Sequence, residues 1–152
     1  MKLLLSRSDH KEISWLDRKT IDLFRQMAAT LGGTKDVVEV VLVRDAFIRK
    51  INREHRGVDR ATDVISFSYL EDDHPCGENI AGEIYVSYET VQKEAKRQAV
   101  NPKHLFLRVG VHGLFHVLGY THETNERARE MEAEERRILG THLDAETLDA
   151  LF

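Results

Sequence analysis

The sequence predicts an α+β fold: a single layered domain with a mixed sheet of about four strands and five to six helices. Three observations support this class. Short β-branched or apolar segments read as strands, longer segments repeat apolar residues at helical spacing, and the helices fall unevenly among the strands. No repeat, low-complexity tract or flexible linker divides the chain, so residues 1–152 are expected to form one domain.

Three elements are predicted at the beginning of the chain. An apolar run predicts a strand over residues 2–6, and β-branched residues predict another over 37–43. Between them, helical spacing of apolar residues predicts an amphipathic helix over 14–31 that ends at Gly32 and Gly33. Its apolar residues are Leu16, Leu23, Phe24, Met27 and Leu31.

A second helix and a third strand follow. Asp45 is expected to be the N-cap of a helix that runs to about His55. The side chains expected to face inward from this helix are Phe47, Ile48 and Ile51. After a turn at Gly57, residues 63–68 predict a strand, and the polar residues 71–79 predict a loop.

The remainder is mainly helical. The predicted elements are a strand over 81–87 and helices over about 88–99, 102–118 and 124–139, with a short helix from about Ala145. Asn101 is expected to cap the helix that has Pro102 at its first position. The helix over 124–139 keeps a narrow apolar line at Ala128, Met131 and Ile138. We interpret its glutamates as a solvated face; they are Glu126, Glu130, Glu132, Glu134 and Glu135.

The composition favours a globular protein in a reducing compartment. The hydrophobic content is 41%, and no apolar run approaches the ~18–20 residues needed to cross a bilayer. Cys76 is the only cysteine, so an intrachain disulfide is impossible and a cytoplasmic location is expected. The net charge of −4 argues against nucleic-acid binding by the whole surface but leaves room for a local basic patch.

Three histidines form the strongest functional signal. His112 and His116 are four residues apart, so they share one face of the predicted helix. Gly119 can end that helix, and the chain can then bring His122 back to the same face. Three neutral imidazoles leave a tetrahedral ion one open position, as catalytic zinc requires. Cys76 could add a fourth ligand, although an incidental thiol in a polar loop is the favoured interpretation.

The histidine spacing matches that of metzincin peptidases, but the residue after the first histidine differs. Those enzymes place a glutamate there as general base. Here the position is Gly113, which cannot accept a proton, so a zinc metallopeptidase is only an alternative. Gly113 itself has two open interpretations: it lets backbone or substrate approach the metal closely, or it allows tight helix packing.

A basic cluster lies upstream of the histidines. Arg49, Arg53, Arg56 and Arg60 recur at spacings of four, three and four residues, so a continued helix would align them on one side. The planar guanidinium suits phosphate oxygens, and such a stripe beside a metal would form a groove for a phosphodiester backbone. The competing interpretation, a solubilising helix surface, is favoured by composition alone.

Together these features resemble the YbeY family of zinc-dependent endoribonucleases, which act in ribosomal RNA maturation. The family signature His-Gly-x-Leu-His-Leu-x-Gly-Tyr-Asp-His corresponds to residues 112–122, with Phe115 in place of the family's leucine. A second family segment is matched by Asn52, Arg56 and residues 62–67. A third is matched by residues 82–87.

The resemblance implies that His112, His116 and His122 bind one zinc ion and that Arg56 is the functional arginine beside it. It also favours RNA contact by the basic cluster, and it implies contact with the small ribosomal subunit and its maturation factors. Thr121 stands where the family has an aspartate. If that carboxylate orients a ligand histidine, its loss could weaken metal affinity by ~10–100-fold, although a threonine hydroxyl can keep a hydrogen bond.

We therefore expect a zinc-dependent, single-strand-specific endoribonuclease that acts in ribosomal RNA processing and ribosome quality control. The zinc ion would polarise a water or a phosphoryl oxygen, and Arg56 would neutralise charge on the scissile phosphate. Besides the metallopeptidase, one alternative from another class remains: a non-catalytic ribosome assembly factor with a structural zinc. Three histidines without a visible fourth protein ligand disfavour such a closed site.

Overall fold

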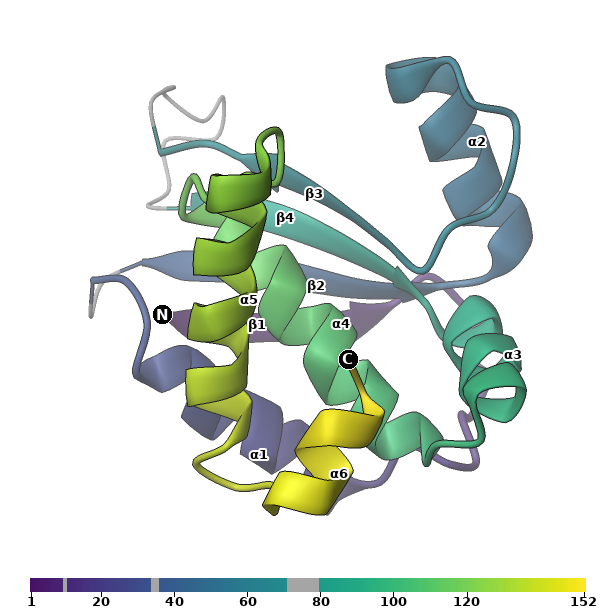
Figure 1. Cartoon of the computed structure of the whole chain (residues 1–152). Helices are drawn as coiled ribbons and strands as arrows, with labels where there is room; N and C mark the ends of the chain where they lie inside the picture. Colours follow the sequence, from purple (N-terminus) through teal and green to yellow (C-terminus); the bar gives the residue numbers. More distant parts are fainter. Residues whose placement is uncertain (10, 34–35, 71–79) are drawn as a thin grey trace.

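The computed structural model describes residues 1–9, 11–33, 36–70 and 80–152, which form a sheet with helices packed on it (Figure 1). The strands are β1 (Lys2–Arg7), β2 (Val37–Val43), β3 (Val64–Ser68) and β4 (Ile80–Ser87). Their order in the sheet is β1-β2-β4-β3. β1, β2 and β4 run parallel to one another, and β3 pairs with β4 in the antiparallel sense at one edge.

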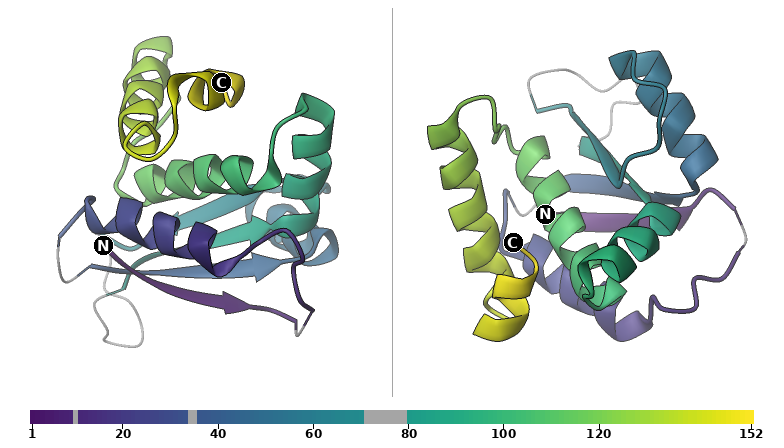
Figure 2. Two further views of the ribbon diagram at one scale, coloured as in Figure 1. Left: turned by 90° about the horizontal axis from the view of Figure 1, so that it is seen from below. Right: turned by 45° about the vertical axis from the view of Figure 1, so that its right-hand side comes forward.

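Six helices occur within these residues. They are α1 (Arg18–Ala29), α2 (Asp45–Arg56), α3 (Tyr88–Gln98), α4 (Pro102–Val117), α5 (Asn125–Leu139) and α6 (Ala145–Ala150). α1 and α4 lie on one face of the sheet, with α5 and α6 over the outer side of α4 (Figure 2). α2 packs on the opposite face, where Ile48 lies against Val43 and Ile65.

The position of α4 follows from its sequence. Ten of its 16 residues are buried, and a helix that is apolar on nearly every side must be covered on nearly every side. The sheet covers one side of α4, α5 covers the opposite side, and α1 packs beside it (Figure 2). Phe24 of α1 and Phe106 of α4 meet edge to face, with ring centroids 5.6 Å apart. The helix that carries two of the predicted ligand histidines therefore lies in the core.

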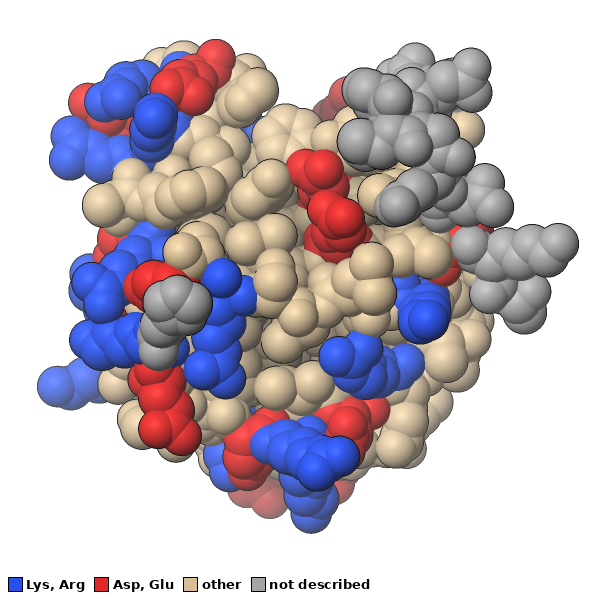
Figure 3. Space-filling view, turned by 180° about the vertical axis from the view of Figure 1, so that it is seen from behind, with Lys and Arg blue, Asp and Glu red and all other residues tan. Residues whose placement is uncertain are grey.

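The opposite face of the sheet differs in character. Figure 3 views the molecule from this side and shows acidic side chains near the centre of a largely uncharged area, with groups of Lys and Arg on several sides of it. Glu39 and Glu83 are register partners on β2 and β4 at this face.

The predicted fold class is confirmed, and most element ends agree with the sequence-based boundaries to within one residue. The first helix is an exception, because it starts at Arg18 rather than at residue 14 and ends at Ala29. The Asp17 carboxylate caps the helix by accepting a 2.9 Å hydrogen bond from the Thr20 amide. Leu16 is buried but lies outside the helix, so helical spacing alone extended the prediction too far.

The start of α2 also differs from the prediction. Arg44 occupies the N-cap position, without a side-chain cap hydrogen bond, and Asp45 is the first helical residue. The Asp45 carboxylate instead accepts hydrogen bonds from three side chains at the β4–α3 junction: Ser87, Thr90 and Lys93. Phe47 was predicted to face inward but is 45% exposed. Its ring stacks on Tyr85 at a centroid distance of 6.2 Å.

The loop predicted over 71–79, including Cys76, lies outside the described residues. Among the residues that are described, none of the helices is long and apolar enough to cross a bilayer.

The Asp17 cap predicts how stability depends on pH. Hydrogen bonds, first from Lys103 and then from Thr20, hold the pKa of the Asp17 carboxyl below its usual range. The folded protein then binds fewer protons than the unfolded chain, so this stabilisation is present above about pH 4 and is lost as the pH falls further. Urea unfolding between pH 3 and 7 should show a shallower acid decline for Asp17→Asn than for wild type. Asp22→Asn, an exposed change on the same helix, should follow wild type.

Candidate metal centre

A cleft of about 840 Å³ runs along one face of α4. The helix contributes His112 and His116 to it, and the segment after the helix contributes His122. β3 lines the cleft with Ser66, and the end of α2 lines it with Arg56. The sequence-predicted histidines and the predicted arginine therefore face one shared space, although they come from separate parts of the fold.

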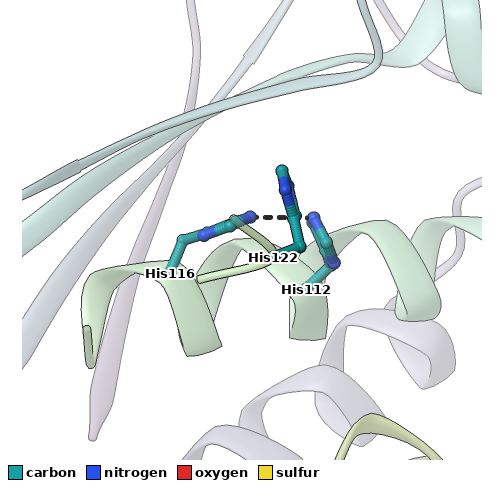
Figure 4. A group of neighbouring side chains, drawn as sticks. All are labelled: His112, His116 and His122. Carbon is teal, nitrogen blue, oxygen red and sulfur yellow. Dashed lines mark hydrogen bonds between the residues drawn. The ribbon is translucent and has the colours of Figure 1, made fainter. Parts of the chain in front are cut away.

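The three histidines converge as predicted. One ring nitrogen from each of His112, His116 and His122 lies within 4.8 Å of the other two. α4 ends at Val117, and Gly119 has φ +97°, a backbone conformation that other residues rarely adopt. This turn brings His122 back over the helix, and Figure 4 shows its ring beside those of the two helical histidines.

Hydrogen bonds fix how the two helical imidazoles present their nitrogens. The Nδ1 of His116 lies 3.0 Å from the Tyr120 carbonyl oxygen, which can only accept, so Nδ1 carries the proton. The Nδ1 of His112 bonds to the Glu135 carboxylate in the same way. In the neutral rings both Nε2 atoms then carry lone pairs.

These lone pairs test whether a metal ion fits. The Nε2 atoms of His112 and His116 face each other at 3.0 Å, where two lone pairs repel unless a cation lies near both. Tetrahedral zinc, with Zn–N bonds of about 2.0–2.1 Å, separates its ligand nitrogens by roughly 3.4 Å, close to this spacing. Burial, reinforced by the neighbouring histidines, lowers the pKa of His116, so the neutral form that metals need is favoured. The residues fit a divalent metal ion.

Glu135 is the site residue that sequence reasoning missed. The glutamates of α5 were interpreted as a solvated face, and for Glu135 this was wrong, because it is only 2% exposed. Its carboxylate accepts from His112 and holds that ring in one orientation. The available signal was its position on the apolar line of α5, between the buried Met131 and Ile138. A buried carboxylate needs a partner, and His112 supplies it.

Glu135→Gln should weaken zinc affinity by ~10–100-fold, because a carboxylate behind a ligand histidine fixes its tautomer and raises its basicity. Titration of zinc against a competing chelator measures this change. Glu130→Gln, at an exposed position of the same helix, is the matched control and should bind zinc as wild type does. Equal zinc affinities for the two variants would show that Glu135 does not contribute to metal binding.

The structure supports the packing interpretation of Gly113. A Cβ atom at this position would lie 3.0 Å from Cγ2 of Ile84 and 3.2 Å from Oγ of Ser66. Gly113 therefore lets α4 lie close to β4 and β3. Thr121 does not replace the family's carboxylate, because its buried Oγ1 has no hydrogen-bond partner among the described residues. Glu135 and the Tyr120 carbonyl orient the rings instead.

The predicted arginine stripe is not continuous. α2 ends at Arg56, followed by Gly57 with φ +69°, so Arg60 does not extend the helix. Arg49 forms two hydrogen bonds with the Asp59 carboxylate, at 2.9 and 3.2 Å. Arg53 lies 3.7 Å from the same carboxylate.

Arg56 is the member of this cluster that lines the cleft. Within the described part of the chain it has no ion pair, so its guanidinium is free to meet an anion. The other three arginines lie away from the cleft lining.

The fold and the site define a class: an α+β protein whose open cleft can hold a divalent metal through three histidines. The chain belongs to the YbeY family, because the model of that family, described as Endoribonuclease YbeY, matches residues 6–142.

Proteins named Endoribonuclease YbeY are among its relatives. The one from Anaplasma phagocytophilum is 33% identical over 141 residues, which cover 84% of this chain and 90% of the relative. The one from a Bradyrhizobium species is 38% identical over 122 residues, or 74% of this chain and 72% of the relative. The one from Nitrobacter winogradskyi is 39% identical over 104 residues, which are 66% of this chain but only 55% of that longer relative.

A solved structure gives independent support for the fold alone. The solution structure of TM1509 from Thermotoga maritima superposes with a TM-score of 0.58 and 24% sequence identity. The superposition covers 91% of this chain and 90% of that one.

Proposed function

We propose that this protein is a zinc-dependent endoribonuclease that cleaves single-stranded RNA. One observation carries the proposal: three convergent histidines and an unpaired arginine line the same cleft in a member of the YbeY family. The names of the relatives indicate RNA as the substrate. Three imidazole ligands suit zinc.

Each residue has a role in the proposed mechanism. His112, His116 and His122 would hold the ion, which supplies Lewis-acid polarisation when bound. Glu135 and the Tyr120 carbonyl keep the His112 and His116 rings in the ligating tautomer.

Arg56 acts from another wall of the cleft. It would bind the scissile phosphate and neutralise the negative charge that develops on its oxygens. The cleft is open to solvent, so an extended single strand can enter it. Single-strand specificity is proposed from the family resemblance.

The cellular setting is also part of the proposal. We infer action in ribosomal RNA processing and ribosome quality control, with contact to the small ribosomal subunit, from the family resemblance. A cytoplasmic location is consistent with a single cysteine, which cannot form an intrachain disulfide.

The proposal is tested by incubating purified protein with an end-labelled ribosomal RNA precursor, with and without a chelator. Metal-dependent cleavage is the expected result. Product ends identify the nucleophile, because a 2′,3′-cyclic phosphate implicates the RNA 2′-hydroxyl and a 5′-phosphate implicates water. Casein digestion that a chelator blocks would instead support the metallopeptidase alternative, which Gly113 disfavours. Ribosome binding by His116→Ala, with no cleavage by wild type at any metal loading, would support the assembly factor.

A further inference from the structure

Arg108 is a second arginine of the cleft. It lies on α4 four residues before His112, so Arg108, His112 and His116 follow one another along the same face of the helix. All three line the cleft. Arg56 lies on a different wall, so the metal centre and two cationic groups from separate elements share this space.

The segment after α5 holds the Arg108 side chain in place. Its Cζ lies 4.1 Å from the centroid of the Phe152 ring, and its Nη1 donates to the Leu151 carbonyl oxygen. Arg136 also lies over the Phe152 ring, at 4.4 Å. Stacking occupies the flat face of a guanidinium and leaves its N–H edge available. Leu151 and Phe152, which make these contacts, lie beyond the range matched by the family model.

The charge of Arg108 is not neutralised by an ion pair. Arg136, which lies over the same Phe152 ring, is paired with Asp149 at 3.1 Å. Arg108 has no such partner within 4 Å among the described residues, and its one hydrogen bond uses one of five N–H donors.

Three carboxylates act on Arg108 without a direct contact: Glu135, Glu132 and Asp63. The buried Glu135 is already committed to His112. Glu132 lies toward Arg136, 3.7 Å away. Burial lowers the pKa of the Arg108 guanidinium, yet arginine stays charged in proteins. Half-buried charge also interacts more strongly with an anion than a fully solvated one does.

We propose that Arg108 binds a second phosphate of the RNA chain, next to the phosphate held at the histidines, and that Phe152 positions the guanidinium for this contact. The inference rests on the proposed RNA-cleaving function and adds a second backbone contact to it. Because the contact is made to a phosphate, it should strengthen binding of single-stranded RNA without regard to base sequence.

The test measures binding of a labelled single-stranded RNA oligonucleotide at several salt concentrations, in a His116→Ala background that does not consume the RNA. Arg108→Met keeps the length of the side chain but removes its charge. It should weaken binding about tenfold and reduce the slope of log K against log salt by about 0.7, the value for one lost contact to a single strand. Arg108→Lys keeps the positive charge, so the slope of log K against log salt should stay at the value measured without this substitution.

Two controls separate phosphate binding from a structural role. Arg18→Met removes an exposed arginine of α1 outside the cleft and should change neither quantity. Phe152→Ala keeps the charge but frees the side chain, so affinity should fall by about two- to tenfold with an unchanged salt slope.

Each remaining outcome decides a different point. If wild type cleaves RNA but adding Arg108→Met to the His116→Ala protein changes neither the RNA affinity nor its salt slope, the inference fails and the proposed function stands. The inference also fails if Arg108→Met lowers the Tm and the affinity while the slope stays unchanged, since that pattern shows only a structural role. If the His116→Ala protein binds no RNA and wild type cleaves none, the proposed function fails and the inference fails with it.

Discussion

His116→Ala should lower the rate of metal-dependent RNA cleavage by ~10³-fold or more, because Lewis-acid stabilisation by a bound metal is worth several kcal/mol. The His116 ring lies close to both other rings, with ring centroids 4.5 Å from His112 and 4.9 Å from His122. Its removal leaves two ligands, too few for a stable zinc site. Zinc content by atomic absorption and cleavage of labelled RNA should therefore fall together.

The control is His142→Ala. His142 is exposed, bonds to Gln26 at 3.1 Å and lies outside the cleft lining. This variant should keep both zinc and activity. Full cleavage by His116→Ala would show that the activity comes from a contaminating nuclease or from another site.

Arg56→Ala should lower the cleavage rate by ~10²–10³-fold, the usual cost of removing one group that stabilises developing charge on oxygen. Zinc content should stay at the wild-type level, because Arg56 does not contact the histidines in the structure. A single-turnover cleavage assay with saturating enzyme measures the chemical step apart from RNA binding.

Arg49→Ala is the matched control for this variant. Arg49 lies on the same helix, but its guanidinium is bound to Asp59 and does not line the cleft. It should cleave RNA at close to the wild-type rate. Similar losses for Arg49→Ala and Arg56→Ala would indicate that α2 acts through general positive charge rather than through one placed guanidinium.

The metal ligands could be predicted from the sequence because the information is local. His112, His116 and His122 fall within one helix and the turn that follows it, so helix geometry and a single glycine bring them together. The four strands could also be predicted from the sequence, since each has its own β-branched or apolar pattern.

Features that depend on contacts between distant parts of the chain could not be predicted from local sequence patterns. The contact of Glu135 with His112 spans 23 residues and exists only because α5 packs on α4. The contact of Arg108 with Leu151 spans 43 residues. The loss of Arg49 from the basic cluster depends on Asp59, which follows the end of α2 and turns back to pair with it. Spacing along one helix carries no information about such partners.

The most direct test of the metal centre is a crystal structure of the zinc-loaded protein, with anomalous scattering recorded at the zinc edge. One strong peak is expected among His112, His116 and His122, with Glu135 still bonded to His112 and with water or another exchangeable molecule at the fourth position. A fourth protein side chain on the ion, or a peak elsewhere with the three rings turned apart, would contradict an open catalytic site.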